Sequence, residues 1–492
     1  MPDAPIYTPI DRTLRLDTRL FFGVGQVAEG LKNFSISYFA LFYYNHVLGL
    51  SGSLTGLALA IALVVDALTD PVMGSLSDNF RSRWGRRHPF MVGGALPFAL
   101  AFFALFAPPA GMSDGENFAW LLTFTILTRL MMTVYHVPHI ALGAELSANY
   151  DERTRLVATR QICGYLGVFV IAGVGLGYFF ADERGGRLNA DAYVPFAGVM
   201  STLMVVTILL SAWFTRDQIP FLPISRPTEG GSFPFRARML SETASALSNR
   251  SFRPLFVGVL LIFVLVGTEG ALSLYIYEYF WDLDSNDMMV LLIAYPSGLI
   301  AGAALTSRLH RLWDKGPTLI FGTVGWSVFQ LLPVFLRLLG WFPENGTTAL
   351  IATLAGIRLV QGIVVQQSLS SFSSMMGDIT DEHQLETGRR QEGVFFGVVA
   401  FSGKAASGAG SLIAGIALDL IHWPAGLAGQ GDAAVVPAET IRDLGIVYGP
   451  AVAVFAILAP LAYRGYGLNR ERHQAILAEL AARDRATGRT KT

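Results

Sequence analysis

The sequence predicts an all-α integral membrane protein with twelve transmembrane helices in two pseudo-symmetric six-helix bundles. Three observations lead to this prediction. The 492 residues are 52% hydrophobic and only 15% charged, whereas about 25% of residues are charged in soluble domains. The apolar residues gather into runs that match a membrane-spanning helix, which needs about 20 residues. Short polar motifs also recur in the second half of the chain.

Twelve apolar runs have membrane length, and a polar segment divides them into two sets of six. The expected spans lie at about 20–47, 54–76, 89–108, 117–146, 156–181, 193–214, 254–280, 287–306, 317–341, 348–376, 394–421 and 444–464. The segment between the sixth and seventh is rich in Pro, Ser and Arg, which is typical of a linker. We therefore expect an N-terminal bundle at 1–214, a cytoplasmic linker at 215–253, a C-terminal bundle at 254–465 and a cytoplasmic tail at 466–492.

Polar motifs recur at a nearly constant distance along the chain. The matched residues are Glu29 with Glu269, Gly85 with Gly316, and Glu145 with Asp378, separated by 240, 231 and 233 positions. This spacing indicates a duplication of six spans. Paired six-helix halves are a known transporter architecture, in which the substrate site lies between the halves near the middle of the membrane.

Arginine and lysine residues predict the orientation. Nearly all loop arginines follow the even-numbered spans or lie near the termini, and the opposite loops hold only Arg184, Arg187 and Arg442. Because cytoplasmic loops carry the excess of basic residues, we expect both termini in the cytoplasm. Residues 1–19 are polar, so no cleavable signal peptide is expected. The chain is expected to be a multi-pass protein of a bacterial inner membrane.

The second span carries two carboxylates, Asp66 and Asp70. They are four residues apart and therefore share one helix face. An ionised carboxylate at the centre of the bilayer costs about 2.5–3.5 kcal/mol, so two of them need a compensating partner. This partner could be a small monovalent cation or a proton, which would make the pair a coupling-ion site. It could instead be a structural ion pair with Lys404 or Arg160.

Other polar residues inside the spans admit two readings each. Lys404 lies on a face of small residues, where its ammonium could replace an absent cation or form a fixed bridge. Arg160 could bind a polar substrate group or pair with the second span. Glu29 and Glu269 could line a cavity or cap a kinked helix. His136 is expected to hydrogen-bond or titrate at the cavity, and a metal pair with a neighbouring histidine is disfavoured.

A basic turn at 77–88 follows the second span. We expect its side chains to form ion pairs between the two halves that close the cytoplasmic face, although such a cluster could also bind anionic lipid headgroups. The proposed gate consists of Asp78, Arg86, Arg87, Glu145, Asp378 and Arg390.

The sequence lacks the motifs that are typical of several function classes. The sequence contains no G-x-x-x-x-G-K-[ST], H-E-x-x-H or G-x-S-x-G pattern, so neither an enzyme nor an ATP-driven pump is expected. Cys163 is the only cysteine, which excludes an intrachain disulfide and a C-x-x-C metal site. We expect no cofactor, no nucleic-acid partner, and no metal apart from Na⁺ at the aspartates. The partners expected are a small-molecule substrate and the lipid bilayer, with the monomer as the functional unit.

Three stretches carry a family resemblance. They are VDALTDPVMGSLSDNFRSRWGRRHPF (65–90), DERTRLVATRQICGYLG (151–167) and GDITDEHQLETGRRQEGVFFGVVAFSGK (377–404). These stretches resemble the glycoside–pentoside–hexuronide:cation symporter family, a branch of the major facilitator superfamily whose type member is melibiose permease. The similarity covers almost the whole chain. It implies the major facilitator fold, with two six-helix bundles that work by alternating access.

The resemblance also implies site residues. Asp66 and Asp70 fall on the family's cation-site carboxylates, and Thr133 falls on a hydroxyl of the fourth span that joins them. Arg160 and Lys404 fall on basic residues that link the cation site to the sugar site. By this likeness, the coupling machinery is retained.

The sugar site departs from the type member. Its sugar-binding Lys-Asp pair is replaced by Glu29-Gly30, or by Lys32-Asn33 if the alignment slips. His136 stands at the position of the aspartate that sugar and cation share in the type member. Ile140 and Leu369 stand at the positions of its two ring-stacking tryptophans. Because that aspartate is absent, Na⁺ is less favoured as the coupling ion than in the type member, and His136 favours H⁺.

The sequence thus predicts a secondary-active symporter that imports a sugar or glycoside with Na⁺ or H⁺. The expected cavity is lined by Glu29, Lys32, His136, Ile140, Glu269 and Leu369. The stretch YHVPHIAL (135–142) also resembles the animal sodium-dependent lysolipid transporters. A cation-coupled carrier of lysolipids or other amphiphiles is therefore the alternative. A sensor on the same fold is disfavoured, because a sensor need not keep a cation site.

Overall fold

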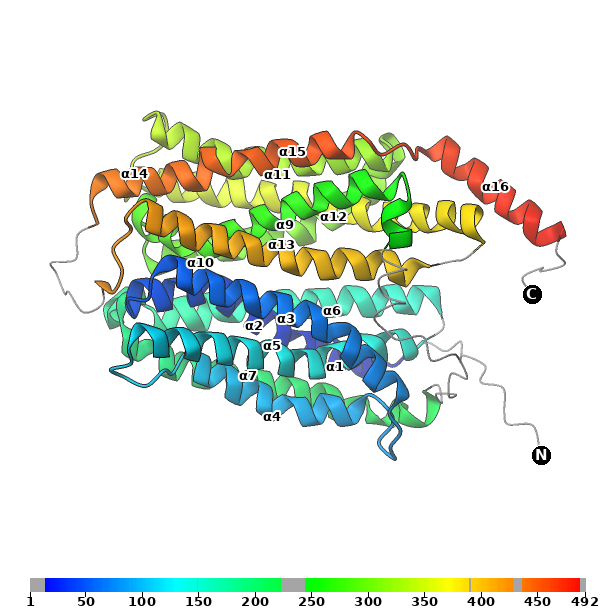
Figure 1. Cartoon of the computed structure of the whole chain (residues 1–492), viewed down its shortest axis with the longest axis horizontal. Coiled ribbons are helices and arrows are strands. Elements are labelled where there is room, and N and C mark those ends of the chain that lie inside the picture. Colours follow the sequence, from blue (N-terminus) through cyan, green and yellow to red (C-terminus); the bar gives the residue numbers. More distant parts are fainter. Residues whose placement is uncertain (1–13, 148, 223–243, 389–390, 428–435, 487–492) are drawn as a thin grey trace. The chain divides into compact units, whose positions relative to one another are not determined.

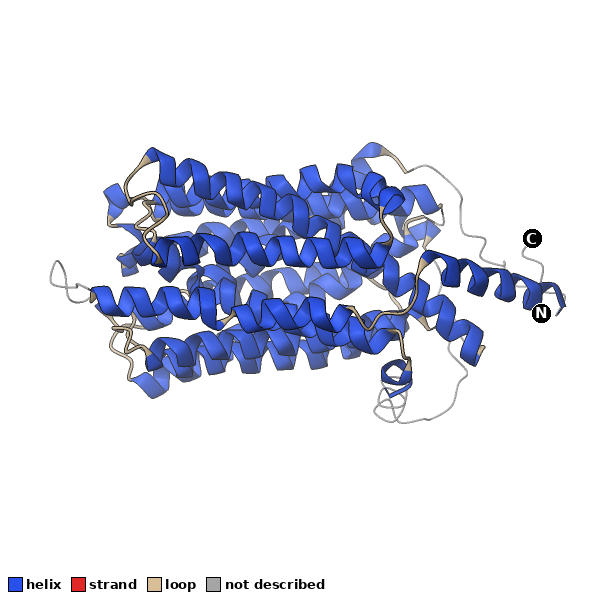
Figure 2. Ribbon diagram, turned by 90° about the horizontal axis from the view of Figure 1, so that it is seen from above, coloured by secondary structure: helices blue, strands red, loops and turns tan. Residues whose placement is uncertain are grey.

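The computed structural model describes residues 14–147, 149–222, 244–388, 391–427 and 436–486. These residues form helices joined by loops, without any strand (Figure 2). Eleven helical stretches of this part of the chain are long and apolar enough to cross a membrane. They run over Gly52–Asn79, His88–Leu105, Asp114–Glu145, Glu152–Phe179, Ala190–Phe214, Phe252–Phe280, Ser285–Leu312, Lys315–Leu338, Thr348–Thr387, Glu392–Leu420 and Ala438–Tyr463. Each overlaps one of the last eleven predicted spans.

The first predicted span, 20–47, is built from short pieces instead of one long helix. It consists of α1 (Leu16–Val24), α2 (Gln26–Phe34) and two π-helical segments, Ser35–Ala40 and Phe42–Val47. π-Helical turns insert an extra residue and are frequent at functional sites. This first predicted span is not among the eleven long apolar helical stretches.

Side-chain and backbone caps fix the ends of several long helices. The Ser51 hydroxyl accepts a hydrogen bond from the Leu54 amide at the start of α3 (Gly52–Asn79). The Thr347 hydroxyl accepts one from the Leu350 amide at the start of α12 (Thr348–Thr387). A Ser113–Glu116 capping box opens α5 (Asp114–Glu145). Such caps satisfy amide groups that have no partner inside the helix. They hold the polar positions of α3 and α5 in register.

Packing brings together the helices that carry the candidate site. In Figure 1, α3 and α5 run side by side, as do α4 (His88–Leu105) and α7 (Tyr193–Phe214). The pieces α1 and α2 pack on α6 (Tyr150–Val170). Here Gly167 permits a close approach, because a Cβ atom there would lie 2.8 Å from the backbone nitrogen of Leu31.

The chain separates into two compact units. Unit 1 contains residues 1–230, 267–293 and 408–444, and unit 2 contains residues 231–266, 294–407 and 445–492. This grouping cuts across the expected boundaries at 214 and 254. The division into two six-helix bundles remains a prediction.

Polar contacts explain why two later segments belong to unit 1. Arg187 forms an ion pair with Glu278 at the end of the helix that begins with α9 (Phe252–Tyr275). The Trp423 indole donates a hydrogen bond to Nδ1 of His46 at 3.0 Å, and the Asp419 carboxylate accepts from the Gly52 amide at 2.8 Å. These contacts tie the ends of α9 and α13 (Glu392–Leu420) to helices of the first half.

Unit 2 contains the remaining long helices, including α11 (Lys315–Leu338) and α15 (Ala453–Tyr463), and ends in α16 (Arg470–Ala486). Helix α16, which lies in the expected tail segment, is docked on its own unit. The Arg470 amide donates to Asp314 at 2.8 Å, and Nε2 of His473 lies 3.0 Å from an oxygen of Asp381.

Candidate functional site

Asp66, Asp70 and Thr133 meet between α3 and α5. The Thr133 hydroxyl oxygen lies 2.9 Å from Oδ1 of Asp66 and 2.9 Å from Oδ1 of Asp70. Asp66 and Thr133 are buried, and Asp70 is half-buried. A hydroxyl carries one proton and can donate to only one carboxylate at a time. The cluster therefore has more acceptor oxygens than protons, which is the chemistry that a small cation or an extra proton would satisfy.

Arg129 completes this cluster, and the sequence-based site did not include it. Its Nη1 atom lies 3.5 Å from Oδ2 of Asp66, and both side chains are about nine-tenths buried. Its Nε atom has no hydrogen-bond partner among the residues that the structure describes. The expected alternative partners of the aspartates were Lys404 and Arg160. The spacing of Arg129 and Thr133, four residues apart on one helix face, could have revealed this partner.

A second polar cluster lies on α2. Asn33 donates a hydrogen bond to Oε1 of Glu29 at 2.8 Å, and the Gln26 amide donates to Oε2 of the same carboxylate. Nε2 of His136 lies 3.2 Å from Oε1 of Gln26 and 4.0 Å from Oε2 of Glu29. Gln26 and Asn33 are additions to the predicted site. Their spacing around Glu29, three and four residues, places all three on one face of the helix.

His136 stands between the two clusters. The charged groups that act on its ring are Glu29, Lys32, Arg160 and Asp70. Lys32 is buried on α2, and Arg160 is half-buried on α6. The structure thus places seven of the predicted residues in these two clusters or among the charges around His136, all within unit 1: Asp66, Asp70, Thr133, Glu29, Lys32, His136 and Arg160.

The other predicted cavity residues lie on separate elements. Ile140 is 41% exposed on α5, and Leu369 is 52% exposed on α12. Glu269 is half-buried on α9, and Lys404 is half-buried on α13. Leu369 and Lys404 belong to unit 2. Their roles in coupling and substrate binding remain predictions.

The proposed gate residues form ion pairs inside each unit. In unit 1, Nη2 of Arg87 lies 2.6 Å from Oε1 of Glu145 and also contacts Asp78, while Nη2 of Arg86 lies 2.9 Å from Glu145. The expectation was that these groups pair between the two halves. Because α3, α4 and α5 pack together, Glu145 at the end of α5 instead reaches the turn between α3 and α4.

The same arrangement recurs in unit 2. Nζ of Lys315 lies 2.7 Å from Asp378, and Nε2 of His473 lies 3.5 Å from the same carboxylate. Arg390 lies outside the described residues. The recurrence agrees with the matched positions of Glu145 and Asp378 in the sequence.

The family described as MFS/sugar transport protein matches residues 21–470. The chain belongs to this family. It is therefore a transporter of the major facilitator superfamily and not an enzyme.

Three relatives of this transporter show the range of the family. The chain is 25% identical to the inner membrane symporter YicJ of Escherichia coli, with 95% of each chain covered. It is 21% identical to the isoprimeverose transporter of Lactiplantibacillus pentosus, over 81% of this chain and 79% of the relative. It is 23% identical to the mouse sodium-dependent lysophosphatidylcholine symporter 1, over 94% of this chain and 87% of the relative.

The fold of this transporter also matches solved structures. The crystal structure of a D-xylose–proton symporter aligns with a TM-score of 0.61 at 13% sequence identity, covering 91% of this chain and 96% of the other. At this identity the likeness shows the fold alone. The major facilitator fold expected from the sequence is confirmed.

Transition metals need defined sets of ligand side chains. Among the described residues, no group of three or more His, Cys, Asp or Glu side chains could hold a metal ion. The oxygens of Asp66, Asp70 and Thr133 are hard ligands, which suit alkali cations better than soft metals. Hard oxygen ligands of this kind are what the predicted coupling-ion site requires.

Proposed function

We propose that this transporter couples Na⁺ or H⁺ to the import of a sugar or glycoside by alternating access. The observation that carries the proposal is the cluster of Asp66, Asp70 and Thr133 with Arg129 at its edge. Two carboxylates within a membrane span require a positive partner. Arg129, 3.5 Å from Asp66, lies at the edge of this oxygen cluster, where the carboxylates and the Thr133 hydroxyl are hard ligands for a small cation.

Cation binding would change the balance of charge in the cluster. With the site empty, Arg129 compensates Asp66. When a cation enters between Asp66, Asp70 and Thr133, it adds a second positive charge to that of Arg129. Two positive charges then face the two carboxylates, and the cluster becomes neutral enough to pass through an occluded state. This differential stabilisation of one conformation is what coupling requires.

The polar face of α2 is the proposed substrate surface. Gln26, Glu29 and Asn33 offer amide donors and carboxylate acceptors on one face, and these are the groups that bind sugar hydroxyls. His136 faces both this surface and Asp70. Its proton and ring position would therefore respond to cation occupancy. His136 would transmit that occupancy to the substrate, together with Arg160 and, from unit 2, Lys404.

Binding assays with purified protein test this function. A ligand that binds the folded state raises the melting temperature by mass action. A panel of sugars and glycosides, each with Na⁺, Li⁺ or K⁺ at two pH values, should contain one sugar whose stabilisation grows with Na⁺ or with proton concentration. Asp66→Asn should remove the cation dependence while Asp114→Asn, an exposed aspartate at the start of α5, should retain it. Sugar stabilisation that ignores every cation and pH would overturn the proposal.

A lysolipid or similar amphiphile is the second candidate substrate. The mouse relative is named for sodium-dependent lysophosphatidylcholine symport. Two aliphatic side chains, Ile140 and Leu369, are 41% and 52% exposed where the type member is expected to stack aromatic rings on its sugar. Exposed aliphatic surface suits an acyl chain better than a sugar ring. Stabilisation by lysophospholipid, with no response to any sugar, would replace the first candidate by the second.

Localisation and assembly follow from the same proposal. The transporter would lie in a bacterial inner membrane with both termini in the cytoplasm, and one copy would suffice for transport. A cysteine added at the C-terminus tests the orientation, because the native Cys163 is buried. In intact cells, a membrane-impermeant maleimide should label this cysteine only after the cells are opened.

A further inference from the structure

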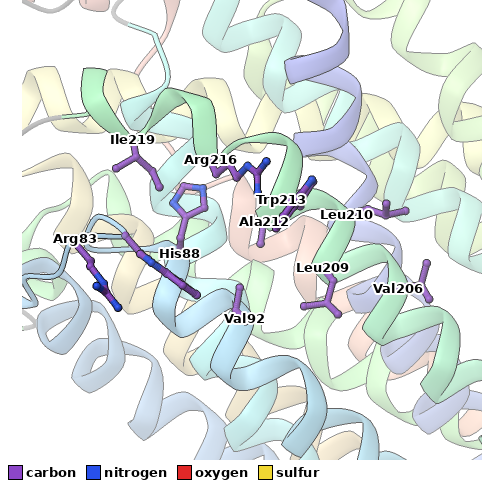
Figure 3. Close-up of a pocket in the computed structure, with 11 residues that line it drawn as sticks. Arg83, His88, Val92, Val206, Leu209, Leu210, Ala212, Trp213, Arg216 and Ile219 are labelled. Carbon is purple, nitrogen blue, oxygen red and sulfur yellow. The ribbon is translucent and has the colours of Figure 1, made fainter.

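A groove at one end of unit 1 lies apart from the candidate transport site. It has a volume of about 720 Å³ and runs between α4 and α7. Its apolar floor is formed by Val92 on α4 and by Val206, Leu209, Leu210 and Ala212 on α7. Figure 3 shows these aliphatic side chains along the two helices, with the polar residues gathered at one end of the groove.

Two guanidinium groups and two indole rings mark that polar end. Arg83 and Arg216 line the groove, and both are exposed. The Arg216 guanidinium lies 3.3 Å from the centre of the Trp213 ring. Trp84 and Trp213 are 54% and 59% exposed. Exposed tryptophans beside basic residues are typical of the level of lipid headgroups in a bilayer.

The turn that presents Arg83 and Trp84 is held in place. The Ser82 hydroxyl donates to the Gly85 carbonyl at 2.7 Å and accepts from the Trp84 amide at 3.1 Å. Gly85 has φ +73°, a left-handed conformation that favours glycine. A Cβ atom there would lie 3.3 Å from Ile219, another residue of the groove. Hydrogen bonds and the turn at Gly85 therefore fix the conformation of the basic end of the groove.

A buried polar atom also lies at this end. His88 is 2% exposed, and its Nε2 atom lies 3.1 Å from the Thr215 hydroxyl. Its Nδ1 atom has no hydrogen-bond partner among the described residues. The negative charge of the nearby Asp217 acts on the His88 ring. The Asp217 carboxylate accepts a hydrogen bond from the Gln218 side-chain amide at 2.8 Å. Two arginines against this carboxylate leave the end of the groove positive.

We propose that this groove binds a phospholipid with an anionic headgroup from the surrounding leaflet. The headgroup phosphate would pair with Arg83 and Arg216, and one acyl chain would lie along Val92, Val206 and Leu209. Guanidinium groups match phosphate geometry closely, and the apolar floor continues from them into the lipid-facing surface of α4 and α7. The site is distinct from the coupling and substrate residues, and it does not depend on which substrate is carried.

Tryptophan quenching by brominated lipids tests the proposal directly. The full chain, with its eight tryptophans, is reconstituted in phosphatidylcholine vesicles. These vesicles contain a small fraction of phosphatidylglycerol or phosphatidylcholine whose acyl chains carry bromine. Brominated phosphatidylglycerol should quench more than brominated phosphatidylcholine at the same fraction. The excess should disappear in the W84F/W213F double variant, which places the bound lipid at this groove.

The arginines are tested with a matched control. The R83Q/R216Q variant should weaken the preference for phosphatidylglycerol by about thirtyfold, from two basic residues at the headgroup level. R253Q/R464Q removes the same charge from two exposed arginines at ends of α9 and α15, and it should leave the preference unchanged. Leu209→Phe should also reduce the preference, because its larger ring fills the groove while both arginines and the set of tryptophans stay the same.

Two results would overturn the proposal. Equal quenching by the anionic and zwitterionic lipids would mean that only ordinary annular lipid occupies the groove. An equal loss in R253Q/R464Q and R83Q/R216Q would mean that diffuse positive charge attracts the lipid. Circular dichroism and size-exclusion profiles check that each variant is folded, and Leu209→Phe keeps the proposal testable if the arginine double variant is not.

Discussion

Arg129 and Asp66 form a buried ion pair between α5 and α3, with Nη1 of the arginine 3.5 Å from Oδ2 of the aspartate. The pair stands beside Asp70 and Thr133, whose hydroxyl oxygen lies 2.9 Å from an oxygen of each aspartate. Arg129 therefore compensates Asp66 at the place where the coupling ion is proposed to bind.

Replacing Arg129 should make the protein depend on the cation for its stability. Breaking a buried ion pair costs about 3–5 kcal/mol, because the remaining charge is left without compensation. Arg129→Gln should therefore lower the melting temperature strongly in the absence of a coupling ion. Saturating Na⁺, or low pH if the ion is H⁺, should restore much of the loss. Arg129→Lys, which keeps the charge, serves as the control. Equal melting temperatures for wild type and Arg129→Gln without the ion would contradict this role.

Thr133 should contribute a neutral ligand to the cation. Its hydroxyl lies at 2.9 Å from both aspartates. A hydrogen bond or neutral ligand of this kind contributes about 1 kcal/mol, so Thr133→Ala should weaken cation affinity about fivefold. Thr133→Ser keeps the hydroxyl and should stay within about twofold of wild type. Isothermal titration calorimetry with Na⁺ and Li⁺ measures both, and unchanged affinity in Thr133→Ala would exclude the hydroxyl from the ion site.

His136 should link the cation to the substrate. It lies 3.2 Å from Gln26 on the α2 face, and it also interacts with Asp70. His136→Asn should retain binding of each ligand alone but remove the increase in substrate affinity that the cation produces. Substrate titrations with and without the cation give this coupling as a ratio of dissociation constants. A ratio that is the same in wild type and His136→Asn would assign the link to other residues.

The sequence predicted most of this site because its strongest clues are local. Charged residues inside apolar runs stand out, and a spacing of four residues places Asp66 and Asp70 on one face. Arg129 shares a helix face with Thr133, so spacing could place it at the site, but not say which aspartate it would pair with. Which face of α5 meets α3 depends on packing between the helices, and periodicity is weak in spans that are apolar on every side.

The fold was predictable for the same reason, but the prediction was wrong about the first span. Long apolar runs gave eleven spans close to their observed bounds, but the first span is divided into short α- and π-helical pieces. Insertions of π-helical turns leave no mark in composition. The gate residues also differ from their prediction. Glu145 and Arg87 were expected to form ion pairs between the two halves, whereas Glu145 at the end of α5 pairs with Arg87 in the adjacent turn.

The Arg87–Glu145 and Lys315–Asp378 pairs should control the rate of conformational exchange. Each joins the end of one long helix to a turn at the start of another within its own unit. Such pairs hold the helix ends rigid, so their loss should affect movement more than ligand binding. Glu145→Gln and Asp378→Asn should each slow substrate exchange in proteoliposomes while leaving substrate affinity nearly unchanged.

The Arg187–Glu278 pair offers a test on the other end of unit 1. Burial lowers the pKa of Arg187, but Glu278 and Asp182 outweigh it and raise the pKa above its usual value. Arg187 therefore stays charged at every physiological pH, and only protonation of its carboxylate partners can break the pair. Arg187→Gln should lower the melting temperature, and Glu278→Gln should lower it by a similar amount. The double variant should lose less than the sum of the two, because either single change already breaks the same ion pair and leaves its other member uncompensated. Additive losses would show that the two side chains act independently. In that case the interaction between them would not be what fastens residues 267–293 to unit 1.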